Sequence, residues 1–288
     1  MQNEKKTILR VDNLALRLLE TSTDIKYGSF TVEENDFVII KGSNGSGKST
    51  FLKIFSPSRS LGYCAHLRGS MYYEVGELRG RDIFSAGYDR ARLLRSVVNI
   101  TQEERFSTFA SARSAILQPA LVAIREDASL AAKEKKTLEG RASDLADYYF
   151  REVLTKYGTF PCSARAFRLK PATAFSGGQQ KMLNLLGGLI KAEVLGSRLI
   201  LMDEPLNNLD GKNKAIFREV MRDMRARNPI AVVAITHCQI FDGINKVITI
   251  DANAAAHENL VSCSTTAPDC HNECLEDICL KTRGARDI

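Results

Sequence analysis

A glycine-rich stretch constrains the fold of this chain more than any other feature of its sequence. It reads GSNGSGKST from Gly42 to Thr50 and lies between two apolar runs, FVII at residues 37–40 and FLKIF at residues 51–55. The first run is typical of a buried strand, and the second of a helix. A glycine-rich turn that joins a strand to a helix is the arrangement of a phosphate-binding loop.

Glycines let backbone N–H groups converge on an anion without side chains in the way, and the helix that follows begins at its positive end. Lys48 can reach the β- and γ-phosphates of a nucleotide, and the Ser49 hydroxyl can ligate Mg²⁺. The expected loop consists of Gly42, Ser43, Asn44, Gly45, Ser46, Gly47, Lys48, Ser49 and Thr50.

Two acidic residues follow a second buried run. The stretch LILMDEP predicts a strand that ends at Asp203 and Glu204. Open α/β sheets bind ligands at the carboxyl edge of their strands, so Asp203 can hold a metal and Glu204 can polarise an attacking water as general base. An aspartate that merely caps a helix would give the same local pattern.

A third motif, FSGGQ at residues 175–179, precedes an apolar-periodic run. Serine followed by glycines is an ordinary helix start, which explains the motif without any function. The same start is also a second anion-binding terminus.

These motifs occur in a characteristic order. GSNGSGKST is followed by Gln102 after a strand, then by FSGGQ, LILMDEP, NNLD at residues 207–210 and ITH at residues 235–237. The set resembles the ATP-binding cassette (ABC) ATPase family over about residues 8–250. Independently, alternating buried strands and amphipathic helices imply a mostly parallel sheet covered on both faces, with a helical insertion. The resemblance implies an α/β P-loop NTPase: a RecA-like mixed or parallel core, an antiparallel β subdomain and an inserted α-helical subdomain.

The resemblance also implies that two cassettes pair head to tail and sandwich two ATP molecules with Mg²⁺. The second subunit is a copy of this chain or a paralogue. Asp210 would cross the seam between them. The residues that would face the γ-phosphate held by the opposite subunit are Ser176, Gly177, Gly178 and Gln179.

Catalytic and metal-binding roles follow from the same resemblance. Gln102 resembles the residue that senses Mg²⁺ and the attacking water, and His237 resembles the switch histidine on the γ-phosphate. The expected catalytic residues are Lys48, Gln102, Glu204 and His237, and the expected metal ligands are Ser49, Gln102 and Asp203.

One position departs from the family pattern. The family often stacks an aromatic side chain on adenine, but Leu18 or Leu19 occupies that place here. Tyr27 is nearby but falls inside an expected strand. How the base is stacked is therefore left open.

We expect an ABC-type ATP-binding domain over residues 1–252, with its helical subdomain at about 103–175, and an irregular cysteine-rich tail over 253–288. A zinc site and a reduced, flexible tail are both compatible with the composition of this tail. Its cysteine spacings lack the Cys-x2-Cys pairs of strong zinc signals, which favours the reduced tail. The tail residues concerned are Cys263, Cys270, His271, Cys274 and Cys279.

Composition and charge bear on the binding partners and the location of the protein. The net charge of +6 is too mild to indicate nucleic-acid binding, the N-terminus does not resemble a secretion signal, and no apolar run approaches the length of a membrane span. We expect a cytoplasmic protein, peripheral on the cytosolic face of a membrane. The runs GSMYYEVGELRGRDIF and ARLLRSVVNITQ resemble transporter-type cassettes, which favours an ATP-hydrolysing motor subunit bound to a membrane-spanning transporter subunit.

The alternative is a soluble ATP-driven switch that acts on a protein, nucleic-acid or cofactor-assembly complex. The paired asparagines of DEPLNNLD and the unusual helix sequence MLNLLGG weakly favour this soluble switch.

Overall fold

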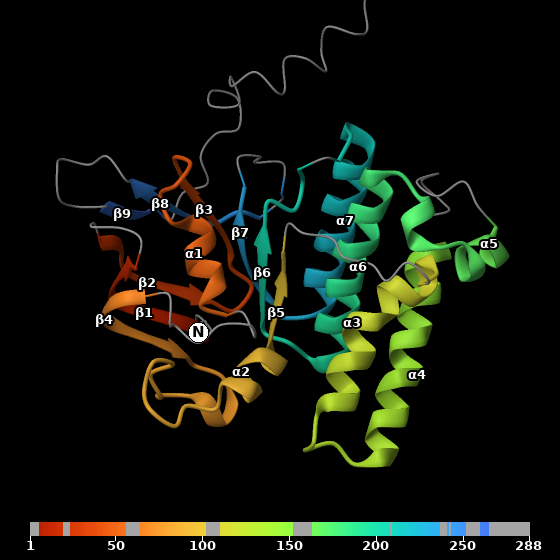
Figure 1. Cartoon of the computed structure of the whole chain (residues 1–288), viewed down its shortest axis with the longest axis horizontal. Coiled ribbons are helices and arrows are strands. Elements are labelled where there is room, and N and C mark those ends of the chain that lie inside the picture. The colour runs from red at the N-terminus through yellow and green to blue at the C-terminus, as the bar shows by residue number, and fades with distance from the viewer. Residues whose placement is uncertain are drawn as a thin grey trace, which may run out of the picture.

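Two β-sheets, with helices on both faces of the larger sheet, make up the described part of the chain (Figure 1). The computed structural model describes residues 6–19, 24–55, 64–101, 110–151, 163–207, 209–236, 241, 243–251 and 260–264.

The larger sheet has six strands in the order β5-β6-β7-β3-β8-β9. Its strands are β3 (Phe37–Gly42), β5 (Val97–Ile100), β6 (Leu199–Asp203), β7 (Ala231–Ile235), β8 (Lys246–Asp251) and β9 (Leu260–Ser264). Neighbouring strands are parallel except for β9, which runs antiparallel to β8. The central strands are buried on both faces, and this is why they read as uninterrupted apolar runs.

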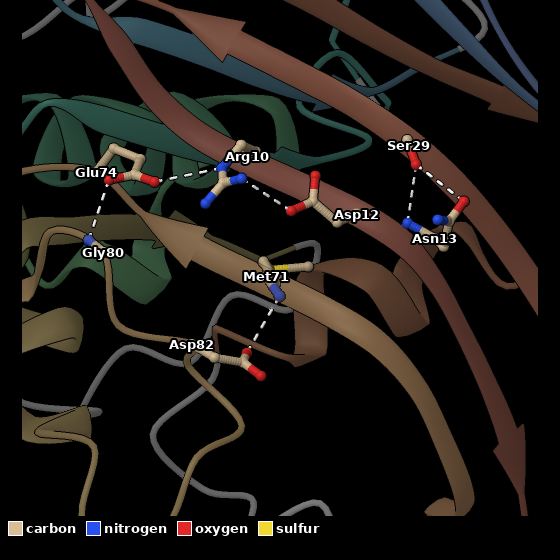
Figure 2. Close-up of polar contacts among 8 residues, drawn as sticks. All are labelled: Arg10, Asp12, Asn13, Ser29, Met71, Glu74, Gly80 and Asp82. Carbon is tan, nitrogen blue, oxygen red and sulfur yellow. Dashed lines mark hydrogen bonds and ion pairs between the residues drawn. The ribbon is translucent and has the colours of Figure 1, made fainter.

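The smaller sheet is antiparallel, in the order β2-β1-β4. Its strands are β1 (Thr7–Leu18), β2 (Asp24–Glu33) and β4 (Cys64–Tyr73). Polar contacts join residues of this sheet to one another and to the segment that follows it (Figure 2). The Arg10 guanidinium contacts Asp12 at 3.0 Å and Glu74 at 3.4 Å. The Asp82 carboxylate accepts a hydrogen bond from the Met71 N–H.

Strand β1 carries an irregularity at Asn13. Asn13 has φ +49°, and its N–H and amide oxygen both bond the Ser29 hydroxyl, at 2.9 and 3.1 Å (Figure 2). A Cβ on Gly69 in β4 would lie 2.3 Å from the Asn13 carbonyl oxygen, so only glycine fits there. The pairing of β1 with both neighbours shifts register around this point, which is typical of a β-bulge.

The helices divide between the two faces of the larger sheet. They are α1 (Lys48–Lys53), α2 (Arg90–Ser96), α3 (Ala112–Glu126), α4 (Ala132–Tyr148), α5 (Ala164–Leu169), α6 (Gly177–Leu195) and α7 (Gly211–Arg227), with single 3-10 turns at Gly76–Leu78 and Ala172–Ala174. One hydrophobic core joins α1, α2 and the antiparallel sheet to one face, and a second joins α3, α4, α6 and α7 to the other. Successive strand residues point alternately into these two cores: Val38 and Ile40 into the first, Phe37 and Ile39 into the second.

Two glycines in α6 let it approach its neighbours closely. A Cβ on Gly187 would lie 3.2 Å from the Pro119 side chain in α3, and one on Gly188 would lie 2.4 Å from the Ile100 side chain in β5. The unusual sequence MLNLLGG therefore has a packing explanation, so it no longer supports the alternative of a soluble switch.

A buried carboxylate joins three helical elements. Glu193 in α6 is 4% exposed, and one of its oxygens accepts bonds from the Tyr149 hydroxyl at 2.5 Å and from the Arg227 guanidinium at 3.0 Å. Burial, followed by the nearby Glu193 carboxylate, raises the pKa of Tyr149. The end of α4 and the end of α7 are thus tied to the same point on α6.

The structure confirms the expected fold class and the helical insertion, and it corrects one expectation. The chain after residue 252 is not irregular throughout, because β9 at Leu260–Ser264 extends the larger sheet. The polar composition of that segment is explained by its edge position, where a strand has one neighbour only. No helix among the described residues combines the length and apolar character needed to cross a bilayer.

The two environments of helical glycines give a first prediction. Nothing lies within 4 Å of a Cβ built on exposed Gly140 in α4, so Gly140→Ala should stabilise the fold by about 0.5–1 kcal/mol. The same change at Gly188 forces the Ile100 side chain to move and should cost about 1–3 kcal/mol. Urea unfolding of the two variants measures both; equal stabilisation by both would contradict the close packing of α6 on β5.

Candidate active site

The phosphate-binding loop expected at Gly42–Thr50 leaves the carboxyl end of β3, between β7 and β8. Gly45 and Gly47 have φ of +81° and +96°, values that residues with a Cβ rarely adopt. Gly42 is required for a different reason, since a Cβ there would lie 2.3 Å from the Ile250 carbonyl oxygen in β8. The loop is therefore built around backbone geometry that only glycine allows.

Lys48 folds back over this loop. Its ammonium donates to the carbonyl oxygens of Gly42 at 2.7 Å and Ser43 at 2.8 Å, and the residue is 8% exposed. Burial lowers the pKa of Lys48, while the nearby Glu204 and Asp203 carboxylates act in the opposite direction. The ammonium is thus held at the loop, where phosphate oxygens can take over its bonds.

Ser49 and Asp203 bring together the oxygens expected for Mg²⁺. The Ser49 hydroxyl donates to the Asp203 carboxylate at 3.4 Å, across from the loop to the end of β6. Mg²⁺ prefers such hard oxygen ligands and usually keeps several waters and substrate phosphates in its shell. Within the described part of the chain no group of three His, Cys, Asp or Glu side chains converges.

Glu204 is fixed by its backbone. It has φ +45°, which is uncommon outside glycine, and its N–H donates to the Ile235 carbonyl at 2.9 Å. The turn after β6 is thereby held against the end of β7, with the Glu204 carboxylate at the carboxyl edge of the sheet. This is the position at which a general base for a loop-bound substrate is needed.

The Ser176 motif forms a capped helix start. The Ser176 hydroxyl accepts the Gln179 N–H at 3.4 Å, and the Gln179 side chain accepts the Ser176 N–H at 3.1 Å, the reciprocal pattern of a capping box. Ser176 and Gly177 are exposed at the surface. Helix capping thus accounts for the local structure, and the expected contact of Gly177 and Gly178 with phosphate stays a prediction.

Asp210 likewise caps a helix. Its carboxylate accepts the backbone N–H of Asn213 at 2.7 Å and the side-chain N–H of the same residue at 3.1 Å, at the start of α7. The residue is exposed, and its expected place at a dimer seam stays a prediction.

Gln102 and His237 lie outside the described residues, so their expected roles also stay predictions. Their chain neighbours are placed: the Thr101 carbonyl accepts a bond from Asn184 in α6 at 3.4 Å, and Thr236 is buried at the end of β7.

Tyr27 has a role that sequence reasoning missed. The residue is 1% exposed, and its hydroxyl donates to the Gly47 carbonyl at 2.8 Å. Leu18 or Leu19 is expected at the family's stacking position, and Leu19 is 66% exposed. The available signal was the alternation of Ile25 and Tyr27 with polar residues, which places both on the inward face of β2.

Comparison with known proteins agrees with this geometry. The family model described as ABC transporter matches residues 25–207. The chain belongs to this family. An ABC transporter ATP-binding protein of Haemophilus influenzae is 26% identical over 240 residues, which span 81% of this chain and 75% of that protein. The phosphate import ATP-binding protein PstB of Bacteroides fragilis is 25% identical over 205 residues, 71% of each chain.

Solved structures agree on the fold. The structure of cbiO1 from Clostridium perfringens, part of the ABC transporter complex cbiONQ, superposes with a TM-score of 0.59 at 19% identity and covers 85% of each chain.

As a member of the ABC family, the chain is an ATPase. The family match includes the phosphate loop, the Ser176 helix start and the Asp203–Glu204 pair, whereas Asp210 and His237 follow the matched range. The position and oxygen chemistry of Ser49 and Asp203 fit Mg²⁺, which generally accompanies ATP in this family.

Asp203 should set the affinity for Mg²⁺. In Asp203→Asn, the Mg²⁺ concentration that half-saturates the ATP-bound protein should rise by about tenfold or more, because a charged oxygen ligand is lost. Titration of Mg²⁺ with a fluorescent ATP analogue measures this. Asp223→Asn is the matched control, since that carboxylate is exposed on α7. An unchanged Mg²⁺ requirement in Asp203→Asn would remove Asp203 from the metal site.

Proposed function

We propose that this chain is the ATP-hydrolysing motor subunit of an ABC transporter and that it works as a head-to-tail dimer. The second subunit is another copy of the chain or a paralogue. The dimer binds a membrane-spanning subunit at the cytosolic face of a membrane. Its relatives, which include a phosphate import ATP-binding protein, support a transport role over a soluble switch.

One observation carries the dimer proposal: α1 and α6 belong to opposite faces of the larger sheet. The phosphate loop leads into α1, whose side chains pack in one core, while the Ser176 helix start leads into α6, which packs in the other (Figure 1). If both helix starts bind one ATP, a second subunit is the natural source of the second start. Head-to-tail pairing supplies it twice, once for each loop.

The residues of the site divide the work of hydrolysis. Lys48 and the loop N–H groups bind the β- and γ-phosphates, and Glu204 takes the proton of the attacking water. Ser49, Asp203 and Gln102 would hold Mg²⁺, which when bound neutralises charge on the phosphates. His237 contacts the γ-phosphate. The residues of the opposite subunit that close over it are Ser176, Gly177, Gly178 and Gln179.

Closure must precede hydrolysis in this arrangement, because each site takes donors from two subunits. Loss of the γ-phosphate then removes the group that both subunits hold, and the seam weakens. ATP therefore holds the two subunits together reversibly. The helical subdomain at about residues 103–175 transmits the closing and opening of the dimer to the membrane partner.

The domain boundaries are proposed with one adjustment. The ATP-binding domain, expected to end at residue 252, is extended to residue 264 because β9 pairs with β8. The cysteine-rich tail then begins at residue 265. Cys270, Cys274 and Cys279 lie outside the described residues, and a reduced tail remains the favoured alternative to a zinc site.

Glu204→Gln should separate ATP binding from hydrolysis. The amide keeps the shape of the side chain but cannot take a proton, so turnover should fall by about a hundredfold or more. ATP should still bind and hold a dimer, visible by light scattering in the presence of ATP and Mg²⁺. Glu139→Gln on α4 is the control and should behave as wild type. Full turnover in Glu204→Gln would exclude this residue as the base.

Partner capture tests the transport role. The tagged Glu204→Gln protein, purified from mild detergent extracts of its own cells with ATP present, should retain a multi-span membrane protein in equimolar amount. Recovery of ribosomes or nucleic acid instead of a membrane protein would favour the soluble switch.

A further inference from the structure

The Gly47 carbonyl in the phosphate loop is held by two donors. The Phe51 N–H of the following helix reaches it at 3.2 Å, and the Tyr27 hydroxyl reaches it at 2.8 Å from β2. A carbonyl oxygen has two lone pairs, so this one is fully satisfied within the protein. The helix supplies the first bond by itself, whereas the second depends on the hydroxyl of Tyr27.

Fixing this carbonyl fixes the direction of the next N–H group. The peptide between Gly47 and Lys48 is trans, so its C=O and N–H point in opposite directions within one plane. The carbonyl points toward β2 and the protein interior. The Lys48 N–H therefore points away from the Tyr27 hydroxyl and β2.

The phenol itself cannot move far. Tyr27 is 1% exposed, and its ring lies 5.3 Å from the Phe51 ring, centroid to centroid. Ile25, the other inward residue of this part of β2, packs under the loop so closely that a Cβ on Gly47 would lie 2.7 Å from it. The antiparallel sheet thus packs closely against the loop. The hydroxyl of Tyr27 makes the hydrogen bond from this sheet to the Gly47 carbonyl.

We infer that Tyr27 is a positioning residue for nucleotide binding: its hydroxyl anchors the Gly47 carbonyl and thereby aims the Lys48 N–H at the phosphates. This rests on the proposed function of the Gly42–Thr50 loop as the phosphate site. Without the hydroxyl, the Gly47 carbonyl loses a partner and the peptide can rotate. The N–H then has to be reoriented whenever nucleotide binds.

The effect should appear in binding rather than in the chemical step. A backbone N–H that holds a phosphate does so in the ground state and in the transition state alike, and such uniform binding changes KM with little change in kcat. A purely structural defect would instead lower the fraction of active protein, and with it kcat.

The test compares two single-atom deletions, Tyr27→Phe and Tyr73→Phe. Both tyrosines belong to the same hydrophobic core and are buried, and the Tyr73 hydroxyl also donates to a backbone carbonyl, that of Ser96, at 3.3 Å. Tyr73→Phe therefore controls for the loss of one buried hydrogen bond away from the loop. ATP and ADP affinities, KM, kcat and thermal unfolding are measured for the full chain.

Tyr27→Phe should weaken ATP and ADP binding and raise KM by about three- to tenfold, the range expected for one lost hydrogen bond, with kcat within about twofold of wild type. Tyr73→Phe should lower thermal stability similarly but leave nucleotide affinity unchanged. Equal nucleotide affinity in Tyr27→Phe and wild type overturns the inference. A comparable loss of affinity in both variants also overturns it.

Lys48→Ala separates this inference from the proposed function. If Lys48→Ala loses ATP binding while Tyr27→Phe does not, only the role of Tyr27 fails; if Lys48→Ala binds ATP normally, the loop is not the phosphate site and both fail. Should Tyr27→Phe not fold, the wild-type chain labelled with ¹⁵N provides a second test. The Lys48 amide resonance must then be among those that ADP shifts most, and an unshifted Lys48 amide overturns the inference.

Discussion

The loop between β3 and α1 has to present N–H groups to a ligand while the protein satisfies its carbonyl oxygens, and the surrounding structure depends on this constraint. The Lys48 ammonium bonds the carbonyls of Gly42 and Ser43, and Tyr27 bonds that of Gly47. Each of these contacts requires an element outside the loop in a fixed place: α1 for the lysine and β2 for the tyrosine. The antiparallel sheet is therefore part of the nucleotide site although it carries none of the recognised motifs.

The larger sheet imposes a second constraint because it separates two cores. Alternate residues of its central strands face opposite sides, so the helix after the phosphate loop and the helix after Ser176 each pack in a separate core. The two helix starts that the proposal assigns to phosphate binding therefore lead into different cores. The proposed head-to-tail dimer would bring one start from each subunit to the same ATP, so the topology supports the dimer proposal alongside the family resemblance.

Much of this fold could be predicted from the sequence because its elements are locally determined. The strands that precede the phosphate loop and Asp203 were expected from their apolar runs, and the structure has them at Phe37–Gly42 and Leu199–Asp203. The strand at Leu260–Ser264 was not predicted, because an edge strand stabilised by pairing with β8 needs no apolar run of its own. The role of Tyr27 was missed for a similar reason: a hydrogen bond from a strand to a loop 20 positions away leaves no periodic signal.

The contact of Tyr149 and Arg227 with Glu193 shows how the helical insertion is joined to the rest of the site. Glu193 is buried, so the loss of either donor leaves a charged oxygen with fewer partners in a poorly solvated place, and the three side chains should stay together during any movement. They join the end of α4 to the far ends of α6 and α7, the two helices that begin at Ser176 and Asp210. The 19-residue α6 is about 28 Å long, so a small tilt where Glu193 lies displaces Ser176 at its other end. In the proposed dimer, the helix pair that would close over nucleotide is thus held, at its opposite end, by the insertion on which a membrane partner would act.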